Sequence, residues 1–164
     1  MKKLFFVCTV ALIAMVSTTF AQSLTQNTTF LAQKLNSLSR DKDDNAQFSF
    51  KGCQMNIDVK DKDRGDDFNF AMTISWQLKE VRKVSYVKNQ DGFYDLKLDV
   101  PADKIKMNLG FGNDNSINGS FNVNDGKDGK GDKTSFDLKT KDETTVRDIA
   151  ARFETVVNSC KNAK

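Results

Sequence analysis

The C-terminal end of the chain carries the pattern that most constrains the fold. Between Val146 and Cys160, apolar residues recur at the i, i+3, i+4, i+7 spacing of an amphipathic helix, so one face of this helix must be buried. Thr140 and Glu143 have the spacing of a capping box, which places the helix start close to them. We therefore predict a long terminal helix that covers a sheet. Its apolar face comprises Val146, Ile149, Ala150, Phe153, Val156, Val157 and Cys160.

A period-two pattern in the middle of the chain predicts the sheet beneath that helix. Over residues 68–76, large apolar residues alternate with small or polar ones, which gives one dry face and one wet face. Such strands are typical of an antiparallel sheet that is covered on one side. We predict about seven strands, within residues 48–59, 68–76, 78–88, 94–100, 105–111, 117–123 and 136–138.

Local signals predict where these strands bend and end. The apolar phase moves by one residue at Gly52, and we interpret this shift as a β-bulge within the first strand. The alternation is lost near Glu80, which predicts a bend. The Asp91-Gly92 pair predicts a hairpin turn. Pro101 is predicted to end a strand because proline has no N–H for the ladder.

A second, shorter helix is predicted at residues 28–40, where Leu31, Leu35 and Leu38 recur at helical spacing. The predicted fold class is therefore α+β. It consists of an antiparallel curved sheet or partial barrel of about seven strands, packed against the long C-terminal helix, with a short N-terminal helix.

The first 21 residues have the features of a secretory signal peptide. Two lysines precede an apolar run over residues 4–16, and Thr19 and Ala21 supply small residues at the −3 and −1 positions of a cleavage site. The alternative is a retained anchor, but this run is shorter than the ~20 residues that cross a bilayer. We expect residues 22–164 to form a single secreted or periplasmic domain with no integral membrane segment.

Cysteine usage agrees with export. Once the signal peptide is removed, Cys53 and Cys160 are the remaining thiols, and an even count in an exported protein predicts a disulfide. A bridge that closes so long a loop stabilises by roughly 4 to 5 kcal/mol on the chain-entropy model. The alternative is that both thiols are buried and free.

Charge and composition exclude several classes of function. The chain has no His, which removes the usual general base and the usual metal ligand, and we expect no cofactor. Lys and Arg number 25 against 22 Asp and Glu, and loss of Lys2 and Lys3 brings the mature chain close to neutral. A surface so balanced does not favour nucleic acid as a partner.

The aromatic residues offer a candidate ligand site. They either fill the space between the sheet and the terminal helix, or line a pocket for an apolar or aromatic ligand. Phe93 lies on the polar face of its predicted strand and is the first exposed aromatic to consider. The candidate residues are Trp76, Tyr86, Phe93, Tyr94 and Phe111.

Residues 114–125 match the spacing of a calcium-binding loop. Oxygen-bearing side chains stand at alternating positions around a glycine, as a hard cation requires. The flanking residues read as strands, however, and Asn118-Gly119 is equally a hairpin signal. The metal assignment is therefore the less favoured alternative. Its ligands would be Asp114, Ser116, Asn118 and Asp125, with Asn122 at the ninth position.

The strands-then-helix order over residues 48–160 resembles the pleckstrin-homology-like layout, in which a C-terminal helix plugs a bent sheet. The export signal, the Phe-Lys-Gly-Cys at residues 50–53 and the closing helix with Cys160 resemble small exported bacterial proteins of uncharacterised function. Neither resemblance implies a catalytic residue.

We expect a non-catalytic binding or envelope-associated module whose partner is a protein, a glycan or an apolar small molecule. One alternative is a carrier of small apolar ligands. The other is a hydrolase that uses carboxylates without His, which requires a buried acid pair with shifted pKa values.

Overall fold

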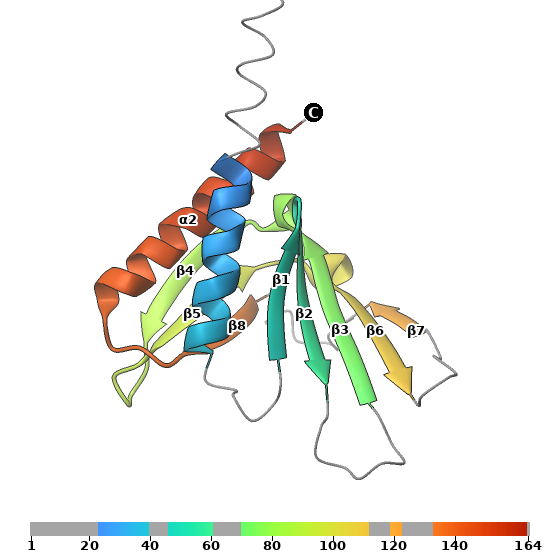
Figure 1. Ribbon diagram of the computed structural model, residues 1–164, viewed down its shortest axis with the longest axis horizontal. Coiled ribbons are helices and arrows are strands. Elements are labelled where there is room, and N and C mark those ends of the chain that lie inside the picture. The colour runs from blue at the N-terminus through green and yellow to red at the C-terminus, as the bar shows by residue number, and fades with distance from the viewer. Residues whose placement is uncertain (1–22, 40–45, 61–69, 112–118, 123–132, 164) are drawn as a thin grey trace, which may run out of the picture.

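The computed structural model describes residues 23–39, 46–60, 70–111, 119–122 and 133–163 (Figure 1). In this part of the chain it contains two helices and eight strands, which confirms the α+β class. The predicted signal peptide and the proposed calcium ligands Asp114, Ser116, Asn118 and Asp125 lie outside the described residues.

The strands form two antiparallel sheets, and neither sheet closes into a barrel. The larger sheet has the order β1-β2-β3-β6-β7, and the smaller sheet has the order β4-β5-β8. The strands of the larger sheet are β1 (Ala46–Lys51), β2 (Gln54–Lys60), β3 (Phe70–Gln77), β6 (Lys106–Phe111) and β7 (Gly119–Asn122). Those of the smaller sheet are β4 (Lys83–Lys88), β5 (Tyr94–Asp99) and β8 (Lys133–Leu138).

Two short 3-10 turns carry the chain from one sheet to the other. The first, η1 (Leu78–Glu80), follows β3, and the N–H of its buried Leu78 donates to the Cys53 carbonyl at 2.8 Å. The second, η2 (Ala102–Lys104), follows Pro101 and returns the chain to β6. The predicted bend at Glu80 and the predicted stop at Pro101 thus mark two of the places where the chain passes between sheets; a further passage separates β7 from β8.

The interpretation of Gly52 as a β-bulge is wrong, because β1 and β2 are separate strands joined by a two-residue hairpin turn. Lys51 pairs with Gln54 across this turn, and Gly52 has a φ of 57°, which favours glycine. A bulge and a two-residue turn both move the apolar phase by one residue. Here Phe50 pairs with Met55, so the dry face continues across the hairpin.

The long C-terminal helix α2 (Glu143–Asn162) buries every residue of the predicted apolar face. Its N-cap is Asp142, whose side chain accepts from the Thr144 N–H at 2.9 Å. The predicted cap, Thr140, instead accepts from the Asp142 N–H at 3.1 Å, one step before the helix. Carboxylates are strong N-caps, which explains the difference.

The predicted disulfide is confirmed. Cys53 lies in the β1–β2 turn and Cys160 near the end of α2, with their sulfurs 2.02 Å apart and their Cα atoms 5.6 Å apart. The bridge therefore fixes the far end of the terminal helix to the first hairpin of the larger sheet.

The N-terminal helix spans residues 23–38 and lies between α2 and β1 (Figure 1). It begins before the predicted Thr28. Leu31 and Leu35 are fully buried. On its α2 side, the Arg152 guanidinium lies 4.1 Å from the centre of the Phe30 ring, and it also donates to the Asn27 side chain at 3.0 Å.

The core fills the space between the helices and the two sheets. Phe136 of β8 contacts two rings of the larger sheet. Its ring centre lies 5.4 Å from that of Phe48 in an edge-on arrangement, and 6.3 Å from that of Trp76 in a stacked arrangement. Aromatic pairs at these distances stabilise beyond the area they bury. Among the described residues, neither helix combines the length and the apolar character that a membrane crossing requires.

Candidate functional site

The structure gathers three of the five candidate aromatics at the β4–β5 hairpin and places a fourth elsewhere. Tyr86 and Tyr94 pair across the hairpin with ring centres 6.0 Å apart, and Phe93 precedes Tyr94. Trp76 is only 2% exposed and belongs to the central core. Phe111 is the last residue of β6 and pairs with Phe70. The expected five-residue site is therefore not assembled as one cluster.

The tyrosine pair is tied to the first turn of α2. The Tyr94 hydroxyl donates to one Glu143 oxygen at 3.3 Å, and Arg147 donates to the other at 2.9 Å. The Arg147 guanidinium and the Tyr94 hydroxyl hold the pKa of Glu143 below its usual value, and burial raises the pKa of Tyr94. Glu143 thus stays ionised and Tyr94 stays neutral, as a structural link between helix and sheet requires.

Lysine ammonium groups lie over two of the aromatic rings of this hairpin. The Lys88 ammonium lies 5.8 Å from the Tyr94 ring centre, and the Lys141 ammonium lies 4.9 Å from the Phe93 ring centre. Both distances are within the range of cation–π attraction. The hairpin aromatics are therefore packed by neighbouring side chains of the same chain.

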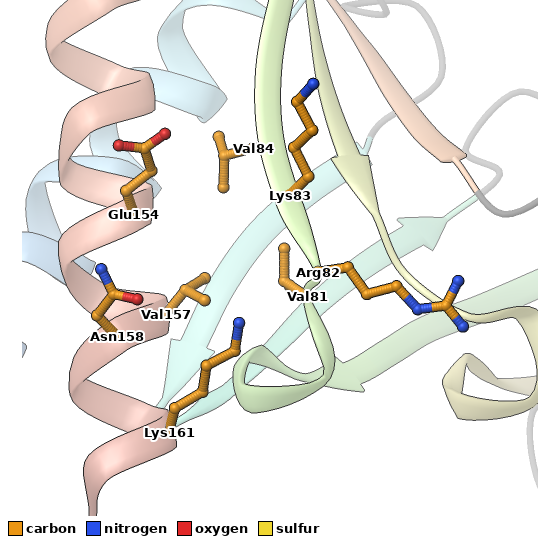
Figure 2. Close-up of a pocket in the computed structure, with 8 residues that line it drawn as sticks. All are labelled: Val81, Arg82, Lys83, Val84, Glu154, Val157, Asn158 and Lys161. Carbon is orange, nitrogen blue, oxygen red and sulfur yellow. The ribbon is translucent and has the colours of Figure 1, made fainter.

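One surface hollow, the α2–β4 groove, is lined by eight residues that Figure 2 shows as sticks. Its volume of about 220 Å³ is smaller than that of typical ligand pockets, roughly 300 to 1,000 Å³. Lys161 and Val157 point from α2 toward the strand, whereas Arg82 points away from the helix (Figure 2) and lies 4.0 Å from Asp99. The lining residues are Val81, Arg82, Lys83, Val84, Glu154, Val157, Asn158 and Lys161.

A larger hollow, the helix–β1 groove, runs between the N-terminal helix and the edge strand β1. Its volume of about 470 Å³ falls within the range of ligand pockets. No lining residue is charged. The lining residues are Leu24, Thr25, Thr28, Thr29, Ala32, Gln33, Asn36, Gln47, Phe48, Ser49, Phe50 and Gly52.

Helical periodicity creates the helix side of this groove. The lining positions 24, 28, 32 and 36, with 25, 29 and 33 beside them, form a stripe that repeats every four residues and therefore lies on one face. The Thr28 hydroxyl is occupied within the helix, where it donates to the Leu24 and Thr25 carbonyls at 3.0 and 3.1 Å. Thr29 and Gln33 are exposed on this stripe.

The strand side of the groove is a sheet edge, because β1 is the outermost strand of its sheet among the strands that the structure describes. The Asn36 amide closes this edge at one point: the Phe48 N–H donates to its oxygen at 2.7 Å, and its nitrogen donates to the Phe48 carbonyl at 2.9 Å. The Phe48 peptide groups therefore face the helix rather than β2.

Peptide groups alternate in direction along an antiparallel strand, so those of Phe50 also face the groove. The closure of the hairpin at Lys51 and Gln54 gives the same phase, since two-residue hairpins begin on a hydrogen-bonded pair. No side chain or turn hydrogen bond of the described residues reaches the Phe50 N–H or carbonyl. The groove thus presents one open donor and one open acceptor of the backbone.

Sequence reasoning missed this groove for a physical reason. Periodicity reports which face of a strand is buried, whereas the groove depends on which strand lies at the sheet edge. The one available signal was the row of hydroxyl and amide residues at Thr25, Thr29, Gln33 and Asn36, and it fell partly before the predicted start of the helix.

Comparisons of this chain with protein-family models, with curated proteins and with solved structures give no match. Among the described residues, no group of three or more Cys, Asp or Glu side chains is placed to hold a metal ion. The chemistry of the site must therefore be argued from its own geometry.

Proposed function

We propose that this chain is a non-catalytic binding module and that the helix–β1 groove is its ligand site. The observation that carries the proposal is the pair of open peptide groups at Phe50, which lie in a neutral groove of about 470 Å³. A hollow of this size with a few convergent polar groups is the usual form of a small-ligand site.

The lining favours a neutral, polar ligand. Hydroxyl and amide side chains such as Thr29, Gln33 and Ser49 offer both donors and acceptors, while Leu24 and Ala32 provide apolar contact. A charged ligand would lose its hydration here without gaining an opposite charge, which is unfavourable. A neutral peptide or glycan therefore fits this lining better than an ionised molecule does.

Three surface carboxylates, Asp103, Asp142 and Glu143, are placed as partners of neighbouring side chains rather than as general acids. Lys104 lowers the pKa of Asp103, the Thr145 hydroxyl lowers the pKa of Asp142, and Arg147 lowers the pKa of Glu143. A general acid at neutral pH needs a raised pKa instead. These three groups are held as ionised partners of neighbouring side chains.

Titration monitored by NMR tests the proposal. We would titrate the 15N-labelled protein, purified with its disulfide intact, with acetyl-Thr-Val-Thr-Val-Thr-amide and separately with cellotetraose. At least one of these neutral probes should shift the amide signals of groove residues such as Thr29, Gln33 and Ser49. If neither probe moves them at millimolar concentration, the groove is not the ligand site.

A matched pair of variants separates the groove from the rest of the surface. Ala32→Phe fills the groove from the helix side and should abolish the shifts. Ala151→Phe makes the same change at an exposed position of α2 that lines neither groove, and should leave the shifts unchanged. Equal binding by both variants would contradict the assignment.

A second candidate is a carrier of apolar ligands, favoured by the inner face of the larger sheet. Met72, Met107 and Leu109 are neighbours on that face and are only partly buried, although their alternation places them on the dry side. Native mass spectrometry of the purified protein distinguishes the candidates. A copurified apolar molecule supports the carrier, and a clean apo mass contradicts it.

The proposal places the protein outside the cytoplasm. The Cys53–Cys160 disulfide agrees with an oxidising compartment. The intact mass of protein recovered from the periplasm or medium should correspond to a chain that begins at Gln22. A mass that retains residues 1–21 would contradict cleavage at that site.

A further inference from the structure

We infer that the ligand of the helix–β1 groove is a short, extended peptide segment that adds to the edge of β1 as a strand. The inference rests on the proposed function and names the ligand class for the same groove. It follows from how the chain already occupies the neighbouring position on the same edge.

Asn36 shows which chemistry this edge accepts. Its side-chain oxygen accepts a hydrogen bond from the Phe48 N–H at 2.7 Å, and its side-chain nitrogen donates to the Phe48 carbonyl at 2.9 Å. An amide thus pairs with one residue of β1 through a donor and an acceptor together, as the opposite residue of an antiparallel ladder does. In this sense Asn36 stands in for one residue of a missing strand.

Phe50 offers the same pair of groups two residues farther along the strand. Strand residues rise by about 3.3 Å each, so the open pair lies roughly 7 Å from the pair that Asn36 occupies. A ligand residue opposite Phe50 can donate its own N–H to the Phe50 carbonyl and accept from the Phe50 N–H. Strand addition to a sheet edge is a recurring mode of peptide recognition.

The ends of the groove limit the length of the added segment. Asn36 blocks the edge at Phe48, and the turn at Gly52 ends β1 on the other side. The space between them holds about three to four extended residues. Because no lining residue is charged, the segment should carry neutral side chains over this stretch.

The decisive experiment uses acetyl-Thr-Val-Thr-Val-Thr-amide and the same peptide methylated on all five residue nitrogens. With the unmethylated peptide, we expect shifts along the groove and slower hydrogen exchange at the Phe50 amide, because that N–H becomes bonded. Methylation removes the peptide N–H that would donate to the Phe50 carbonyl, so it should weaken binding about tenfold or more. Equal binding of both peptides would overturn strand addition.

Asn36→Ala provides a test whose direction is specific to this inference. The variant frees the Phe48 pair and lengthens the open edge, so the peptide should bind about tenfold more tightly. If Asn36 were instead a direct ligand contact, the same change would weaken binding and overturn the inference. The methylated peptide on the unchanged protein keeps the test valid if this variant folds poorly.

Cellotetraose distinguishes failure of the inference from failure of the proposed function. Groove shifts with cellotetraose and none with the peptide would overturn strand addition but keep the groove as a ligand site. Silence with both probes would overturn both proposals.

Discussion

At the scale of single residues, Trp76 combines a large, buried ring with an unmet hydrogen bond. Its ring is 2% exposed and stacks on Phe136, yet its indole Nε1 has no hydrogen-bond partner in the described part of the chain. A buried donor left unpaired destabilises by about 1 to 3 kcal/mol. The apolar surface of the ring must outweigh that penalty.

Two substitutions separate these effects. Trp76→Phe removes the unpaired donor while leaving a modest cavity, so the free energy of unfolding should change by only about 1 kcal/mol. Trp76→Ala should lower it by about 3 to 5 kcal/mol. Urea unfolding measures both values. Equal losses would show that the donor penalty is absent.

Gly52 provides a second test at this scale, because its φ of 57° is unfavourable for side chains. An added Cβ meets no atom within 4 Å, so the penalty of Gly52→Ala is a backbone term of about 1 to 2 kcal/mol. Gly110→Ala is the control, since its Cβ would make ordinary contacts at 3.8 Å. Urea unfolding should show a clear loss for the first variant and little change for the second.

Two carboxyl groups at the start of α2 make the free energy of unfolding depend on pH. Folding lowers the pKa of Asp142 through the Thr145 hydroxyl and the pKa of Glu143 through Arg147. Unfolded carboxyl groups titrate near pH 3.9 to 4.3, so this stabilisation is complete above about pH 5. It is lost as the pH falls through the lower folded values.

Glu143→Gln should therefore reduce the loss of stability between about pH 5 and pH 2, as measured by urea midpoints. Glu154→Gln is the matched control on the same helix, because Glu154 forms no ion pair among the described residues. An unchanged pH dependence in the Glu143 variant would contradict this role of the pair with Arg147.

At the scale of elements, the disulfide joins the β1–β2 hairpin to the end of α2. Replacing both cysteines by serine should lower the free energy of unfolding by about 2 to 5 kcal/mol, mainly because the unfolded chain regains freedom. Urea unfolding of oxidised, reduced and double-serine proteins measures the effect. If all three have the same midpoint, the tether does not stabilise the fold.

Elements with a strong local period could be predicted from the sequence, and those that depend on partners could not. The stripe from Val146 to Cys160 fixed both the helix and its buried face, since i, i+3, i+4 spacing has one structural solution. The shift at Gly52 had two solutions, a bulge or a turn, and only pairing with β2 distinguishes them.

The candidate site could be predicted even less well, because it depends on contacts between residues far apart in the sequence. The aromatic content of the sequence suggested Trp76 and Tyr94 as ligand-site residues. In the structure, Trp76 stacks on Phe136 in the core, and the Tyr94 hydroxyl donates to Glu143. The helix–β1 groove depends on which strand has no neighbour, and strand order is a long-range property. Periodicity along the chain carries no information about it.

At the scale of the whole molecule, the strand order binds early and late parts of the chain together. β8 completes the sheet that β4 and β5 begin, and Phe136 on that strand contacts Phe48 and Trp76 of the other sheet. Neither layer can bury its inner face from a contiguous half of the sequence. Contacts between distant segments of this kind slow folding.

This order has a consequence for the newborn polypeptide. While the chain is being synthesised, its first hairpins lack both the ring of Phe136 and the thiol of Cys160. The ring contacts of Phe136 and the Cys53–Cys160 disulfide can therefore form only after Phe136 and Cys160 have been synthesised. Oxidation of Cys53 and Cys160 is then a late step, which covalently links the first hairpin to the end of α2.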